Sequence, residues 1–198
     1  MRAGVRALGL AESFRGTEST LAGAVVRADR VADGFVFGTC TVGGTDATAT
    51  VRSLFDRLGR EDVRYVFLAG VAPAWFNLLD LPVIYDAVER PVLSVSFEES
   101  PGLEGALREA FSGDALDERL ATYRRQPARQ RLVVNDETLF VRAVGIDDDE
   151  AADAVRTFTP EGGRPEPLRV ARLAARAADD AFVGDATGDE RPDTGDTN

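Results

Sequence analysis

The chain has 198 residues, of which 44% are hydrophobic, and this is enough for one sizeable core. It contains one cysteine and no histidine, which excludes a disulfide framework, a cysteine–histidine zinc site and histidine general-base chemistry. Its net charge of −11 comes from 34 acidic residues and 23 basic residues, all of them arginine, a composition typical of a salt-accumulating halophilic archaeon. Any reaction must therefore use carboxylates, hydroxyls, backbone amides or arginine.

The N-terminal part of the chain predicts strands followed by a helix. Residues 5–14 alternate and then turn polar, which is typical of a strand that leads into a functional loop. Two β-branched runs, 21–30 and 34–42, flank the turn signal Ala32-Asp33-Gly34 and predict an antiparallel hairpin. The next elements are an amphipathic helix over 47–60 and a nearly continuous apolar strand over 63–71, which is typical of a central parallel strand.

The C-terminal part of the chain predicts further helices and strands. Together with the N-terminal elements, they indicate the architecture of the fold. They are a helix from Pro82, a strand after Pro91, helices at 102–112 and 115–125, strands at 131–135 and 137–146, and helices at 147–158 and 166–182. Meandering strands followed by crossover units predict a mixed sheet flanked by helices, of the ribonuclease H-like kind. We expect one domain over residues 1–183 and a disordered acidic tail over 184–198.

Three acids are candidate metal ligands in such a fold. Ribonuclease H-like nucleases use carboxylates near strand ends to hold Mg²⁺, which activates water and stabilises the leaving oxygen. Glu12 follows the first predicted strand, Asp46 the third and Asp80 the fourth. Each has a structural alternative, since Asp46 and Asp80 can cap helices and Glu12 can pair with Arg15. Gathering of the three carboxylates in one cleft would indicate a cation between them.

Other signals in the sequence exclude several chemistries. Phosphate-binding loops of the GxxxxGK[ST] and GxGxxG types, the GxSxG nucleophile elbow and Cys/His clusters are all absent. Gly43 and Gly44 form a turn or a weak phosphate contact, and Cys40 lies in an apolar run that predicts plain core. We expect a cytoplasmic protein, since no secretion signal or membrane-length apolar run is present. In concentrated salt the Debye length is about 3 Å, so the acidity does not exclude a nucleic-acid partner.

Three segments together resemble one family. "RALGLAESF" (6–14), "VGGTDAT" (42–48) with "LAGVAPAWFNLLDLP" (68–82), and "PEPLRVARLAARA" (165–177) are similar to the archaeal endonuclease dU family, formerly UPF0215 and related to endonuclease V. The resemblance implies a ribonuclease H-like fold and an endonuclease of DNA repair that uses Mg²⁺ or Mn²⁺. Its expected partner is DNA with deaminated bases, chiefly deoxyuridine. The alternative is a non-catalytic module on the same fold that binds nucleic acid or protein.

The resemblance also assigns roles to individual residues. The endonuclease V acids fall at Ala11, Asp46 and Ala69, so two of three positions lack the acid, and Arg172 stands where the family pattern has histidine. Asp46 is then the main metal ligand, with Glu12 and Asp80 as further ligands or water activators. The remaining implied contacts are Asn77 as an orienting donor, Gly43 and Gly44 near phosphate, and Arg169 on a phosphate or tied to Glu166.

Overall fold

Three antiparallel strands begin the fold. The computed structural model describes residues 3–186. β1 (Arg6–Arg15) pairs with β2 (Glu18–Arg27), and β2 pairs with β3 (Ala32–Thr41), without a bulge in the β1–β2 ladder. This confirms the predicted hairpin. β1 continues five residues beyond Leu10, however, so that the expected functional loop after the first strand is part of the sheet.

Crossover connections place two parallel strands beside β1. Helix α1 (Ala47–Leu58) leads to β4 (Val63–Ala69), and α3 (Leu81–Val88) leads to β5 (Val92–Ser96). β4 pairs parallel with β1, and β5 pairs parallel with β4. The β6–β7 hairpin completes a seven-stranded sheet of order β3-β2-β1-β4-β5-β7-β6. The other elements are α2 (Pro73–Phe76), α4 (Glu104–Ala110), α5 (Gly113–Arg124), β6 (Gln130–Val134), β7 (Glu137–Val144), α6 (Asp148–Phe158) and α7 (Glu166–Ala186).

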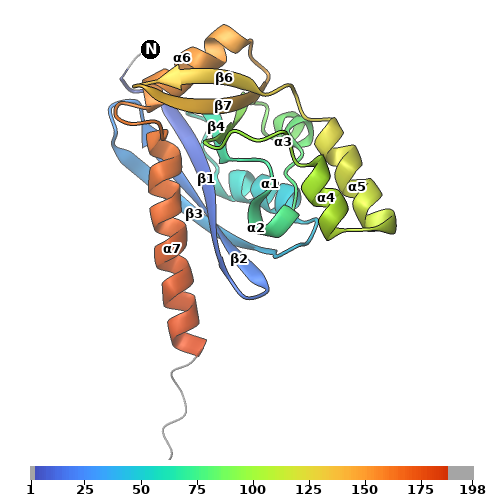
Figure 1. Ribbon diagram of the computed structural model, residues 1–198. Coiled ribbons are helices and arrows are strands. Elements are labelled where there is room, and N and C mark those ends of the chain that lie inside the picture. Colours follow the sequence, from blue (N-terminus) through green and yellow to red (C-terminus); the bar gives the residue numbers. More distant parts are fainter. Residues whose placement is uncertain (1–2, 187–198) are drawn as a thin grey trace, which may run out of the picture.

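Each face of the sheet has its own hydrophobic core. Leu8 and Leu10 of β1 pack with residues of α1 and α3, whereas Ala7 packs on the other face with α6 and Leu168 of α7. Since side chains alternate along a strand, Gly9, Ala11 and Ser13 share the α7 face with Ala7. Figure 1 shows α7 crossing this face along β1 and β2, with α6 above the β6–β7 hairpin.

Helix α7 lies very close to the sheet because the residues between them are small. A Cβ on Gly9 would stand 2.2 Å from the backbone carbon of Pro167, so only glycine fits at this point of β1. Ala11, Ala24 and Ala171 form a buried cluster along the same contact. The PEPLR segment thus begins α7 directly on the central strand.

Most predicted elements are confirmed, and the differences are local. Asn135 and Asp136 form the β6–β7 turn with φ of 49° and 65°, as the predicted turn requires. The sequence did not predict α2, in which Ala74, Trp75 and Phe76 all have positive φ. Helix α7 extends to Ala186, past the predicted start of the tail at 184, and residues 187–198 lie outside the described part. None of the helices within 3–186 has the length and apolar character needed to cross a membrane.

Candidate functional site at the carboxyl edge of the sheet

Asp46 and Asn77 belong to one hydrogen-bond network at the start of α1. The fully buried Asn77 donates through Nδ2 to Asp46 Oδ1 at 2.6 Å and to the Thr41 carbonyl at 2.8 Å. Its Oδ1 accepts from the Ala47 amide at 2.9 Å, so a distant loop provides the polar cap of α1. Asp46 occupies the cap position, but its carboxylate accepts from Thr41 rather than from the helix. Burial alone raises the pKa of Asp46, and the hydrogen bonds from Asn77 and Thr41 outweigh it and lower the pKa.

Asp80 caps α3, as the structural alternative predicted. Its carboxylate is 5% exposed and accepts from the Val83 amide at 3.4 Å. Arg125, the residue that follows α5, donates to Asp80 Oδ2 through Nη2 at 2.6 Å, and the Asp80 amide donates to Thr48 Oγ1 at 2.9 Å. These contacts join α1, α3 and α5, so the polar groups in "FNLLD" hold the fold together.

Glu12 lies inside β1 and points away from the α7 face. Because the ladder has no bulge here, Glu12 and Ala11 face opposite sides of the sheet. Glu12 accepts from Ser19 Oγ at 2.8 Å on the α1 side, near the buried Cys40. Burial, with the nearby charges of Asp46 and Glu12, raises the pKa of the Cys40 thiol to about 12, which agrees with its predicted core role. Glu12 therefore does not stand in for an acid at position 11.

The three candidate acids are not gathered around one space. Among residues 3–181, whose side chains are described, no three Cys, Asp or Glu side chains form a group that could hold a metal ion. Ala11 and Ala69, at the positions implied by endonuclease V, provide no ligand on the α7 face. The residues present at this edge do not fit a divalent cation.

The remaining predicted contacts serve local structure. The Gly43 amide donates to the Ala74 carbonyl at 2.7 Å, and the Gly44 amide donates to the Thr41 carbonyl at 3.0 Å, so neither points freely at a ligand. Arg119 donates to both glycine carbonyls. Arg169 forms two hydrogen bonds with Glu166 in the first turn of α7, which was the structural alternative for this residue.

A pocket of about 420 Å³ lies beyond the carboxyl ends of β4 and β5, and we call it the serine pocket. The buried Ser94 points into it from β5, and Arg142 of the paired strand β7 lies beside Tyr123, whose hydroxyl accepts from Arg142 Nη2 at 3.2 Å. Burial lowers the pKa of Arg142. The lining residues are Ala69, Gly70, Val71, Ala72, Ser94, Ser96, Glu98, Ser100, Gly102, Leu103, Ala106, Tyr123, Arg129, Phe140 and Arg142.

A second hollow of about 440 Å³ lies on the α7 side of the same edge, and we call it the arginine cleft. Arg164 precedes α7, and Arg172 and Arg176 stand one turn apart on the helix. The cleft meets the serine pocket at shared lining residues on both β4 and β5. Its lining residues are Ala69, Gly70, Val95, Ser96, Phe97, Glu98, Arg164, Arg172 and Arg176.

Sequence reasoning missed both hollows, although α7 contains a signal for one of them. Arg169 has Glu166 one turn earlier, but Arg172 has no acid three or four residues away in either direction; the charged residues at this spacing are Arg169 and Arg176. Two like charges on one helix face are unfavourable without a partner. Asp179 and Asp180 follow Arg176 by three and four residues, but in the structure both pair with Arg15, so the signal becomes clear only with the fold.

Comparison with known proteins agrees with this fold. UPF0215 proteins of Pyrobaculum aerophilum and Thermococcus gammatolerans are 33% and 37% identical to the chain; the alignments cover 86% and 84% of it and 92% and 83% of the relatives. A crystal structure of an Archaeoglobus fulgidus protein of unknown function has a TM-score of 0.78 at 26% identity, covering 87% of this chain and 97% of that one.

More distant structures confirm the ribonuclease H-like fold class. Human ENDOV has a TM-score of 0.64 at 12% identity, over 90% of this chain and 85% of that one. Ciona intestinalis endonuclease V, crystallised with inosine-containing DNA, also has a TM-score of 0.64, at 11% identity over 89% and 87% of the two chains. The family model described as endonuclease dU matches residues 3–179. The chain therefore belongs to the endonuclease dU family.

Proposed function

We propose that this protein recognises DNA containing a deaminated base, chiefly deoxyuridine, and acts on it as an endonuclease of DNA repair. The observation that supports the proposal most directly is the serine pocket beside the arginine cleft at the carboxyl edge of β4 and β5. Membership of the endonuclease dU family indicates the substrate class and the reaction. A pocket of about 420 Å³ is in the size range of small-molecule sites and is able to receive one extruded base.

The polar groups in the serine pocket favour uracil over cytosine. Deamination replaces the exocyclic amino donor of cytosine by a carbonyl acceptor. The Arg142 guanidinium donates only, whereas the hydroxyls of Ser94 and Tyr123 donate or accept. A uracil carbonyl that faces Arg142 can accept a hydrogen bond from its guanidinium. The amino group of cytosine in the same place cannot, because the amino group and the guanidinium are both donors and each would be left unpaired. A deaminated base is also easier to unstack from its duplex, which adds to selection.

A second candidate function is binding of such DNA without cleavage. It is favoured by Ala11 and Ala69 and by the separate partners of Glu12, Asp46 and Asp80. The endonuclease proposal keeps those three acids as candidates for the hydrolytic step, with Asp46 first because its carboxyl is held ionised. Because the described residues at this edge do not fit a divalent cation, the Mg²⁺, Mn²⁺ and EDTA conditions test whether the proposed cleavage uses a metal at all.

The deciding experiment measures binding and cleavage on the same oligonucleotides. End-labelled strands with deoxyuridine, deoxyinosine or no lesion are incubated in concentrated KCl with Mg²⁺, Mn²⁺ or EDTA. The proteins compared are the native chain, Asp46→Ala, Ser94→Ala and the matched control Ser53→Ala on α1, with folding checked by circular dichroism. The proposal expects lesion-dependent nicking that Asp46→Ala abolishes, and a roughly tenfold loss for Ser94→Ala on the deoxyuridine strand alone.

Two outcomes separate the candidate functions. Lesion-selective binding with intact strands under every metal condition supports the binding module and rejects the endonuclease. Equal affinity for all three strands rejects recognition of deaminated bases by this protein. Nicking that persists in Asp46→Ala removes this acid from the reaction.

A further inference from the structure

The three arginines of the arginine cleft have no hydrogen-bond or ion-pair partner in the part of the chain whose side chains are described. Arg164, Arg172 and Arg176 make no hydrogen bond or ion pair with residues 3–181, whose side chains the structure describes. The contrast with their neighbours is clear, because Arg169 holds Glu166 and Arg15 contacts Asp179 at 3.4 Å. In a chain with 34 acidic residues, these three guanidinium groups are left without an ion pair in the described part of the chain.

The cluster is held in place despite mutual repulsion. The Arg164 guanidinium lies over the Phe97 ring at 4.2 Å from its centre, which fixes a half-buried cation at the floor of the cleft. Burial, and then the charges of Arg172 and Arg176, lower the pKa of Arg164. Such an arrangement is unfavourable in the free protein, and an anion between the guanidinium groups removes the penalty.

We propose that the arginine cleft binds a phosphodiester group of nucleic acid without a divalent cation. Guanidinium groups match phosphate oxygens with paired N–H donors, and three of them surround this hollow. The three positive charges lie on the α7 face of the sheet, where Ala11 and Ala69 provide no metal ligand. The protein itself therefore supplies the positive charge that neutralises the phosphate. Binding of a phosphodiester in the arginine cleft does not depend on the proposed function. Placing the base attached to that phosphate in the serine pocket does rest on the proposed function.

Replacing Glu98 should change the affinity for nucleic acid in the opposite direction from replacing an arginine of the cleft. It is the one acid among the residues that line the cleft, and it forms no ion pair with the three arginines in the described structure. Its negative charge therefore opposes a bound phosphate. Replacing it by glutamine removes that repulsion while keeping the shape of the side chain.

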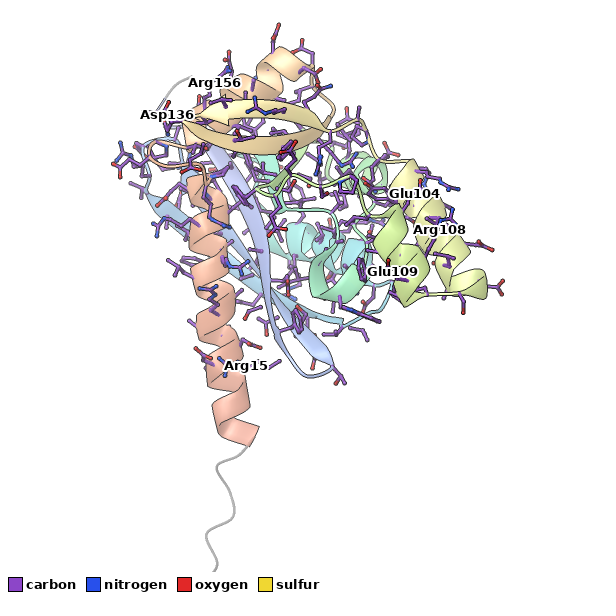
Figure 2. All side chains as sticks on the ribbon, viewed as in Figure 1. Arg15, Glu104, Arg108, Glu109, Asp136 and Arg156 are labelled. Carbon is purple, nitrogen blue, oxygen red and sulfur yellow. The ribbon has the colours of Figure 1, made fainter. Side chains whose placement is uncertain are left out.

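Fluorescence anisotropy of a labelled single-stranded oligonucleotide in EDTA tests the proposal, with KCl varied. The variants are Arg172→Gln, Arg164→Gln and Glu98→Gln, and the charge-matched control is Arg156→Gln. Figure 2 shows Arg156 on α6, away from α7, and it pairs with Asp153 at 3.5 Å. We expect each cleft arginine variant to weaken binding roughly tenfold and to reduce the slope of log affinity against log salt by about 0.7. Glu98→Gln should tighten binding roughly threefold, and Arg156→Gln should change it less than twofold.

The outcomes separate this proposal from the proposed function. Binding that disappears in EDTA and returns with Mg²⁺ overturns it, as does native affinity in both Arg172→Gln and Arg164→Gln. Arginine-dependent binding that is equal for deoxyuridine and undamaged strands supports the phosphate site while rejecting lesion recognition. Thermal unfolding of each variant shows that a lost affinity is not a lost fold.

Discussion

At the scale of single residues, the hydrogen-bond partners of a buried polar side chain show whether its role is structural or functional. Asn77 satisfies an amide at the start of α1, a carbonyl at the end of β3 and a carboxylate, all with one side chain. In the sequence it stands in an apolar stretch, where a buried asparagine is equally consistent with a site or a support. The partners that decide between these roles are about 30 residues away along the chain.

We expect Asn77→Ala to lower the free energy of unfolding by about 2 kcal/mol, because buried hydrogen-bonding groups at Ala47 and Thr41 lose their partner. Urea unfolding measures this difference. Thr50→Ala, which removes only an exposed hydrogen bond to Thr39, serves as the control and should change stability by less than about 1 kcal/mol. A loss for Asn77→Ala no larger than that of the control would contradict the assigned role.

Cys40 should be inert in the folded protein. The side chain is 2% exposed and the pKa of its thiol is raised to about 12, so both access and thiolate are lacking at neutral pH. We expect no alkylation by iodoacetamide at pH 8 under native conditions and complete alkylation in guanidinium chloride, as measured by intact mass. Rapid native labelling would show that the region around Cys40 opens.

At the scale of elements, the seating of α7 depends on one position of β1. We expect Gly9→Ala to destabilise the protein by about 2 kcal/mol or more, because its Cβ has no room against Pro167. Thermal unfolding checks this. Gly105→Ala in α4 is the matched control, since nothing lies within 4 Å of its added Cβ and the change should stabilise the helix by about 0.5 kcal/mol. Equal midpoints for the two variants would contradict close contact between β1 and α7.

Periodicity in the sequence is local information, and it predicted the strands and helices well for that reason. The hairpin, the crossover helices and the central strand all follow from apolar spacing and turn residues within a few positions. The left-handed residues of α2 have no such signal, because alanine, tryptophan and phenylalanine rarely adopt that conformation. The arginine cleft was not predicted because its lining comes from α7 and from the ends of β4 and β5, which are far apart in the sequence and meet only in the folded protein.

At the scale of the whole molecule, the absence of histidine determines how stability depends on pH. The pKa of Asp46 and of several paired acids is lowered in the folded state, so their contribution to stability is complete above the ordinary values of 3.8 and 4.5 and is lost as the pH falls through the lowered values. The paired acids and the arginines that lower them are Asp33 with Arg6, Asp62 with Arg60, Glu104 with Arg124 and Glu166 with Arg169.

We therefore expect the melting temperature to be flat between about pH 5.5 and 8 and to fall steeply below about pH 4. Differential scanning calorimetry in concentrated KCl measures this profile. Asp46→Asn, which cannot ionise, should show a shallower fall than the native chain. A marked step near pH 6.5 would contradict the assignment, because no histidine is present to produce it.

The central position of β1 also affects biosynthesis. β1 is synthesised before the other strands of this sheet, yet one edge of it pairs with β4 and one face is covered by α7, the last helix described. Until residues near 176 have emerged, Ala7, Gly9 and Ala11 face solvent or a chaperone rather than their native neighbours. This face of β1 is therefore covered only after α7, which follows it by about 150 residues in the element order, has been synthesised and has packed against the strand.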